Sequence, residues 1–205
     1  MILALKLHTI LVLFHLVGLI LGFGMALAVD ALLLKRAFFS RINKDLIQNV
    51  EFLSHLVALG LVILWISGIA LAVDNYLANA KFVTNAKFWS KVFIVIMLTI
   101  GAINIHMNVL PKVKEREGRS LLEGASILTC MNWALASSIS IVSWSLPLIL
   151  GAARELSYVT PFFTVLTFYF SCVVTLFIPI FLFCYLNSII DENGVIIRHQ
   201  SNFRT

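Results

Sequence analysis

Four of the five histidines of this chain, His8, His15, His55 and His106, lie inside long apolar stretches of the sequence. An ionisable side chain is costly in apolar surroundings, so each of these imidazoles needs a partner, a cavity or a bound group. Imidazole nitrogens bind haem iron, copper and zinc, and they also hydrogen-bond across packed helices. The histidines are therefore the first candidates for chemistry, with helix-to-helix hydrogen bonding as the structural alternative.

The depth of each histidine along its helix predicts which of them meet. At about 1.5 Å per residue, His8 and His15 lie about 15 Å and 5 Å outward from the middle of their apolar run. His55 and His106 lie about 11 Å and 7 Å inward on the next two runs. These two histidines share a level on neighbouring antiparallel helices, which is the arrangement that a bis-histidine haem b needs. His8 has no histidine at its own depth.

The same histidine pair also allows two other kinds of site. His55 and His106 could bind a metal ion, with Cys130 as a third ligand, although their spacing matches no local metal motif. Asp30 and His15 extend the set into a polar path across one half of the bundle, as in a metal-handling or small-solute permease. A non-catalytic membrane subunit, in which the histidines only hold helices together, is the third alternative.

The predicted fourth helix carries its own stripe of small, hydroxylated and aromatic side chains at three- and four-residue steps. Such a stripe favours tight helix packing. A sharper interpretation places the edge of a porphyrin or quinone against Trp133 or Trp144. The stripe consists of Ser126, Cys130, Trp133, Ser137, Ser140 and Trp144.

Composition identifies the elements that carry these residues. The 205 residues are 60% hydrophobic and only 12% charged, with a mean hydropathy of +1.00. This excludes a cytosolic enzyme, a disordered chain and a disulfide scaffold. Each of five apolar runs is long enough to cross a bilayer as a helix, so the sequence predicts an all-α bundle of five transmembrane helices. The runs are Leu7–Val29, Phe52–Val73, Val92–Pro111, Gly124–Ala153 and Pro161–Ile190.

A cleaved signal peptide is the competing interpretation of the first run, but the run is longer than a signal core and contains two histidines.

Ten Lys and Arg residues fall in the first gap, the third gap and the tail, against five on the other side, from a total of 15. The positive-inside rule then predicts an outer N-terminus and a cytoplasmic C-terminus in a multi-pass membrane protein. The net charge of +5 reports this orientation and indicates no nucleic-acid partner.

One domain covers residues 1–190, followed by a short cytoplasmic tail, 191–205, in which Asn193-Gly194 predicts a turn. Gly18 and Gly22 form a G-x-x-x-G on the same helix face as the first two histidines, which permits close helix approach. That face should look into the bundle, and the same glycines could join copies into a homo-oligomer within the lipid bilayer.

The first three runs resemble the membrane protoporphyrinogen oxidase family (HemJ) and, more loosely, CopD-type copper resistance domains. The resemblance rests on Lys6-x-His8 with His15 and Gly18, on Leu64-Trp65-Ile66-Ser67-Gly68, and on the segment 88–95. It implies haem binding and oxidation of protoporphyrinogen in the membrane, with His8 as the first-helix histidine and Lys91 as the third-helix lysine, able to meet a propionate. His15 stands where the family has tryptophan.

Two haem assignments therefore stay open. The resemblance implies His8 as a single ligand with Lys91 nearby, whereas the depth estimate favours His55 with His106. The sequence leaves open whether the protein is an enzyme, because no nucleotide-binding loop, nucleophile elbow or H-E-x-x-H is present.

Overall fold

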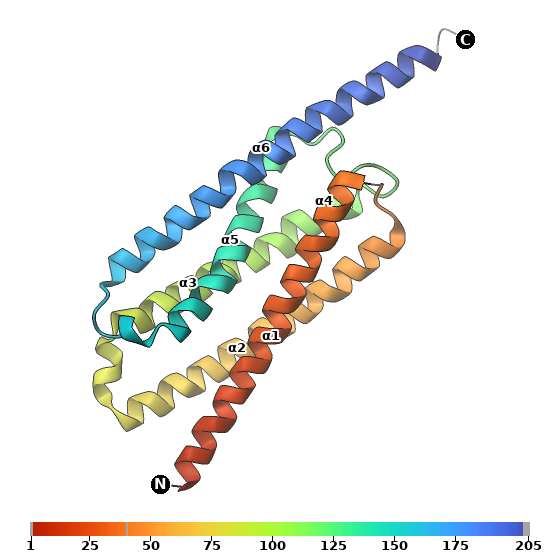
Figure 1. Cartoon of the computed structure of the whole chain (residues 1–205). Helices are drawn as coiled ribbons and strands as arrows, with labels where there is room; N and C mark the ends of the chain where they lie inside the picture. The colour runs from red at the N-terminus through yellow and green to blue at the C-terminus, as the bar shows by residue number, and fades with distance from the viewer. Residues whose placement is uncertain (1, 40, 203–205) are drawn as a thin grey trace.

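The computed structural model describes residues 2–39 and 41–202, and the side chains of 7–35, 41–153 and 155–189. These residues form helices without a named strand (Figure 1). The elements are α1 (Ile2–Phe39), α2 (Lys44–Ala78), η1 (Ala80–Thr84), α3 (Ala86–Asn104), η2 (Ile105–Val109), α4 (Leu110–Lys114), α5 (Ile127–Ala152), η3 (Arg154–Leu156) and α6 (Phe162–Asn202).

Five helical segments in the described part of the chain are long and apolar enough to cross a membrane, which confirms the predicted number. They contain 26 to 35 residues each, so each exceeds the roughly 20 residues that the hydrocarbon core requires. α3, η2 and α4 together form the third of these segments, Ala86–Lys114. The N- and C-termini lie at opposite ends of the long axis of the bundle (Figure 1).

The helices α2, α3 and α5 begin at polar caps rather than at the edges of the apolar runs. Asn43 accepts a hydrogen bond from the backbone N–H of Leu46, and Ser126 accepts one from that of Thr129. Such caps satisfy donors that the first turn of a helix leaves unpaired. The fourth span therefore starts after Ser126 and not at Gly124, as the hydropathy alone predicted; Gly124 has a φ of +59°, which suits a turn.

The turn predicted at Asn193-Gly194 is wrong. α6 continues as one helix from Phe162 through these two residues to Asn202. A glycine inside a helix costs only about 1 kcal/mol relative to alanine, so a single Asn-Gly step does not end a helix that is already long.

The five spans pack as two groups. α1 packs chiefly on α2, whereas α5 packs on both α3 and α6; α1 also contacts α5 and so joins the groups. The close α1–α2 contact depends on glycine: a Cβ added to Gly60 would lie 2.4 Å from the backbone nitrogen of Gly22 and 2.9 Å from the carbonyl oxygen of Gly18. The predicted inward face of α1 is confirmed, because Gly18, Gly22 and Ala26 are all buried within one chain. Association of copies through these glycines stays a prediction, and it would require this contact to open.

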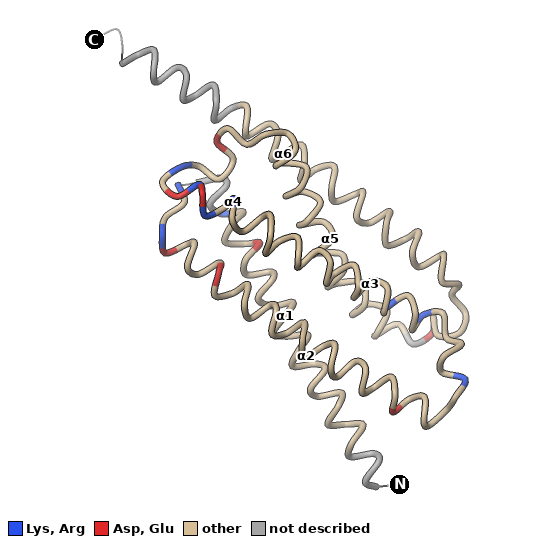
Figure 2. Tube along the Cα trace, turned by 180° about the vertical axis from the view of Figure 1, so that it is seen from behind, with Lys and Arg blue, Asp and Glu red and all other residues tan. Residues whose placement is uncertain are grey.

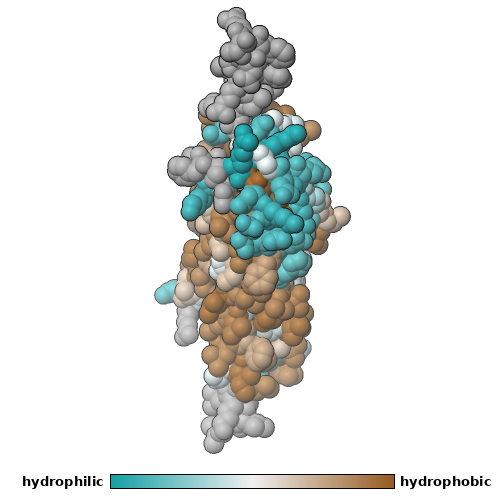
Figure 3. Space-filling model, turned by 90° about the vertical axis from the view of Figure 1, so that its right-hand side faces the viewer, coloured by the Kyte–Doolittle hydropathy of each residue, from teal (hydrophilic) through white to brown (hydrophobic). Residues whose placement is uncertain are grey.

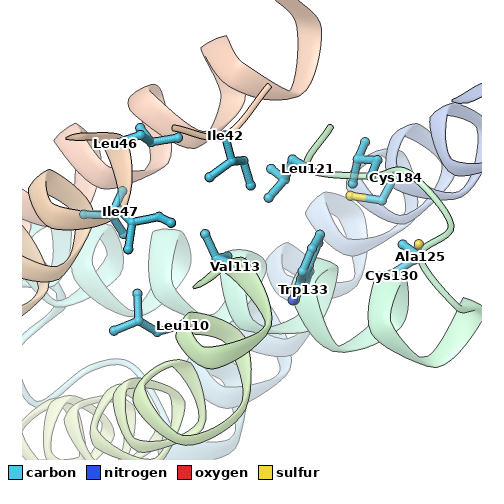
Figure 4. Packing of buried hydrophobic residues seen from close by; sticks show 12 residues of the cluster. Ile42, Leu46, Ile47, Leu110, Val113, Leu121, Ala125, Cys130, Trp133 and Cys184 are labelled. Carbon is cyan, nitrogen blue, oxygen red and sulfur yellow. The ribbon is translucent and has the colours of Figure 1, made fainter. Parts of the chain in front are cut away.

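One end of the bundle is closed by a cluster of buried side chains that we call the Ile42 cluster (Figure 4). Ile42, between α1 and α2, donates its N–H to the Arg119 carbonyl at 2.9 Å and accepts from the Gly118 N–H at 2.8 Å. The loop before α5 is thereby held over the start of α2. The cluster consists of Ile42, Leu46, Ile47, Val50, Leu110, Val113, Leu121, Leu122, Ala125, Cys130, Trp133 and Cys184.

The outer surface of the spans is apolar. Large side chains such as Leu77, Phe163 and Ile20 are more than 70% exposed, and hydrophobic residues form a broad band on the face shown in Figure 3. Most charged residues lie toward the two ends of the tube in Figure 2. A surface of this kind is compatible with contact to the lipid bilayer.

Candidate histidine site and intramembrane cavity

His55 and His106 face each other, as their predicted depths indicated. The centres of their rings are 6.3 Å apart, with an angle of 47° between the ring planes. Neither imidazole forms a hydrogen bond or an ion pair with another described residue. His55 is exposed on the outer surface of α2, and His106 is half-buried. His55 thus lies on the outside of the bundle, whereas His106 lies in the wall of a cavity inside it.

A local change in helix geometry presents His106. The segment Ile105–Val109 is a π-helix, in which the N–H of Leu110 donates to the carbonyl of Ile105, five residues back. The next residue, Pro111, has no N–H to donate, so the ordinary helical ladder is interrupted here. Such π-turns are frequent at functional sites because they re-aim side chains.

A small cavity of about 50 Å³ lies beside His106, between the two groups of helices. α1, α2, α3 with η2, and α5 all contribute to its wall, which is mostly apolar. Its polar lining residues are Asp30, Ser54, His106 and Ser140. Trp144 forms another part of the wall, and its ring is also packed against Gly22.

The other two described histidines are occupied by partners on α2. His8 Nδ1 lies 2.6 Å from Asp74 Oδ2, and His15 Nδ1 lies 2.9 Å from the hydroxyl of Ser67. That hydroxyl donates its hydrogen to the carbonyl of Ile63 at 2.6 Å, so His15 Nδ1 is assigned as the donor to Ser67. Both contacts are hydrogen bonds between α1 and α2. His8 and His15 therefore take the structural role, helix-to-helix hydrogen bonding, that was the alternative to binding a cofactor or metal.

Lys91 lies at the opposite end of α3 from His106. The 15 residues between them correspond to about 22 Å along a helix, so Lys91 and the His55–His106 pair belong to separate places. The Lys91 ammonium points toward Gly151 near the end of α5. One turn earlier, the buried Lys87 donates to the carbonyl of Ala153 and, at 3.2 Å, to the hydroxyl of Ser157.

Trp133 and Cys130 lie in the Ile42 cluster and not in the wall of the cavity. The guanidinium of Arg116 lies 5.4 Å from the centre of the Trp133 ring, and it donates to the carbonyl of Glu123. Burial lowers the pKa of the Arg116 guanidinium below its ordinary value. The indole N–H of Trp133 is buried without a hydrogen-bond partner in the described part of the chain.

The three-ligand site of His55, His106 and Cys130 is not formed. Across the described residues, no three side chains of His, Cys, Asp or Glu come together in a way that could hold a metal ion. Cys130 packs in the Ile42 cluster because the α5 face that carries it turns toward α4 and α6, whereas His106 turns toward α2. A metal site that uses His55 and His106 alone stays a prediction.

Sequence reasoning missed the residues that complete the polar contacts. Asp74 and Ser67 bind the histidines of α1, although Asp74 had only marked the end of an apolar run. Ser54 precedes His55, and its position inside an apolar stretch was the available signal for a cavity residue.

No family model matches this chain, and no characterised protein or solved structure matches it significantly. Its function is therefore inferred from its own residues, and the resemblance to the protoporphyrinogen oxidase family stays a prediction.

Proposed function

We propose that this protein is a haem-associated membrane redox protein in which His55 and His106 are the two axial ligands of a haem b. The observation that carries the proposal is the 6.3 Å separation of two imidazoles that form no hydrogen bond or ion pair with another described residue. The remaining described histidines, His8 and His15, already have hydrogen-bond partners on α2.

The separation of the two rings would allow both imidazoles to hold one metal ion between them. A bond of about 2 Å on each side, plus about 1 Å from each nitrogen to its ring centre, places two trans imidazoles about 6 Å apart. Around a tetrahedral ion the same two ring centres would be only about 5 Å apart. The 47° angle between the rings fits as well, because a trans imidazole can rotate about its own metal–nitrogen bond.

The number of protein ligands also favours haem over a bare ion. Structural zinc sites use four protein ligands and catalytic ones three, whereas no group of three suitable side chains exists among the described residues. A porphyrin supplies four equatorial nitrogens and leaves two axial positions for the protein. Two histidines are then a complete set, and the bound iron would supply one-electron redox chemistry.

The exposure of His55 indicates where the macrocycle would lie. The cavity beside His106, at about 50 Å³, is far too small for a porphyrin. The iron of a haem held by both rings would lie between them, so the macrocycle would extend inward beyond this cavity as well as outward on the exposed side of His55. Lys91 is about 22 Å along α3 from this place, so it would not meet the propionates of this haem. The excess of Lys and Arg at the predicted inner side supports a position of the pair in the cytoplasmic half of a bacterial inner membrane.

Absorption spectra of the detergent-purified protein, oxidised and reduced, test this proposal. We expect a Soret band and the bands of a six-coordinate low-spin haem in the wild type. His55→Ala and His106→Ala should each abolish the low-spin spectrum, whereas the matched controls His8→Asn and His15→Asn should keep it, because these two rings hydrogen-bond to α2.

A colourless wild-type protein would favour the non-catalytic subunit instead. Loss of haem in His8→Asn, with a normal spectrum in the His55→Ala and His106→Ala double variant, would overturn the pair and favour the assignment implied by the family resemblance.

A further inference from the structure

We infer that the cavity between α1, α2, α3 and α5 is a binding site for a small monovalent cation such as Na⁺, with Asp30 as its charged ligand. The inference does not require haem binding, because its proposed ligands are Asp30 and two serines; His106 shares the cavity wall with them. It concerns the cavity itself, which the His55–His106 pair does not fill.

The carboxyl group of Asp30, in the apolar segment Leu7–Lys35, has no partner of opposite charge among the described residues. Within the described residues, Asp30 is the one acidic side chain in the cavity wall, and it forms neither a hydrogen bond nor an ion pair. An isolated carboxylate within a bilayer is costly unless a positive group accompanies it. Asp74, by contrast, has His8 as its partner.

Two buried hydroxyls open into the same space. Ser54 and Ser140 are only 6% and 8% exposed, and neither hydroxyl has a hydrogen-bond partner in the part of the chain that the structure describes. Other buried serines of these helices, Ser67 and Ser138, donate back to a carbonyl four residues earlier. The unpartnered hydroxyls of Ser54 and Ser140 line the cavity from α2 and α5, facing the space that Asp30 borders from α1.

The size and the donor set select the class of ligand. A water molecule needs about 10–15 Å³ of such space, so the cavity holds about three waters or one small cation with about two waters. Carboxylate and hydroxyl oxygens are hard donors that suit alkali cations. A divalent ion would need more anionic ligands than the single carboxylate supplies, and the described side chains form no larger acidic cluster.

Thermal unfolding of the purified protein in detergent tests the site, with NaCl, KCl or NH₄Cl replacing choline chloride at constant ionic strength and mildly alkaline pH. We expect a saturable rise in Tm with an inorganic cation, of about 5–10 °C at about 100-fold above the dissociation constant. Asp30→Asn, which keeps the shape of the side chain, should abolish this rise. Asp74→Asn should keep it, because that carboxylate lies outside the cavity.

The double variant Ser54→Ala/Ser140→Ala decides the question if Asp30→Asn fails to fold. It retains the carboxylate, and it should shift the midpoint of the cation response at least about tenfold to higher concentration. A wild-type Tm that is the same in choline and in all three inorganic cations would overturn the inference, and so would a Tm that responds only to acidification. A full cation response in Asp30→Asn, or an unshifted midpoint in the serine double variant, would overturn it as well.

Discussion

Replacement of Gly60 by alanine should separate α1 from α2. A Cβ at this position would lie 2.4 Å from the backbone nitrogen of Gly22 and 2.6 Å from its Cα. Backbone atoms cannot rotate away as a side chain can, so the helices would have to move apart by about 1 Å to restore an ordinary contact. Overpacking of this kind costs about 1–3 kcal/mol, and here it also stretches the His15–Ser67 hydrogen bond.

Gly24→Ala is the matched control on α1, because an added Cβ there meets nothing within 4 Å. Alanine is the better helix former by about 1 kcal/mol, so Gly24→Ala should be neutral or slightly stabilising. Both variants and the wild type can be compared by thermal unfolding in detergent, followed by far-UV circular dichroism. For a chain of this size, Gly60→Ala should lower Tm by about 2–10 °C. A Gly60→Ala protein as stable as the wild type would show that the two backbones do not approach this closely.

Three further outcomes can be measured. Lys87→Met should lower the free energy of unfolding by about 1–3 kcal/mol, because it leaves the Ala153 carbonyl at the end of α5 without its charged donor. Lys81→Met, at an exposed position, is the control. Equal stabilities of the two variants would refute this role of Lys87. Asp74→Asn should cost less than about 1 kcal/mol in thermal unfolding, since the side chains of the His8–Asp74 pair are 46% and 27% exposed; a much larger loss would contradict a solvated pair. Because the C-terminus is predicted to be cytoplasmic, a C-terminal reporter that works only in the cytoplasm should be active. Activity of a C-terminal reporter that works only in the periplasm would reverse the predicted orientation.

Much of the histidine site could be predicted from the position of each residue along its own helix. The rise of a helix per residue placed His55 and His106 at one level, and the structure confirms their proximity with a ring separation of 6.3 Å. The same reasoning placed Cys130 near them, and there it was wrong. Depth alone does not say which way a side chain points around its helix, and the α5 face that carries Cys130 turns toward the Ile42 cluster.

The partners of the α1 histidines also show what the sequence could predict and what it could not. The spacing of His8, His15, Gly18 and Gly22 correctly predicted that one face of α1 looks inward. It could not indicate that Asp74 and Ser67 would meet these imidazoles, because that depends on how far α2 is shifted along and rotated against α1. Gly60 sets that contact through its missing side chain, and its partners lie about 40 residues away in the sequence.

The amino-acid sequence by itself determined that this chain forms five apolar helices with charged residues near their ends, because hydrophobicity is read along a local stretch of chain. Only the tertiary structure decided which faces of those helices meet. It leaves His55 and His106 opposite each other without hydrogen bonds or ion pairs to other described residues, and it brings Asp30 and two serines into the wall of one cavity. These results depend on the simultaneous packing of four helices, and no local stretch of the sequence contains that information.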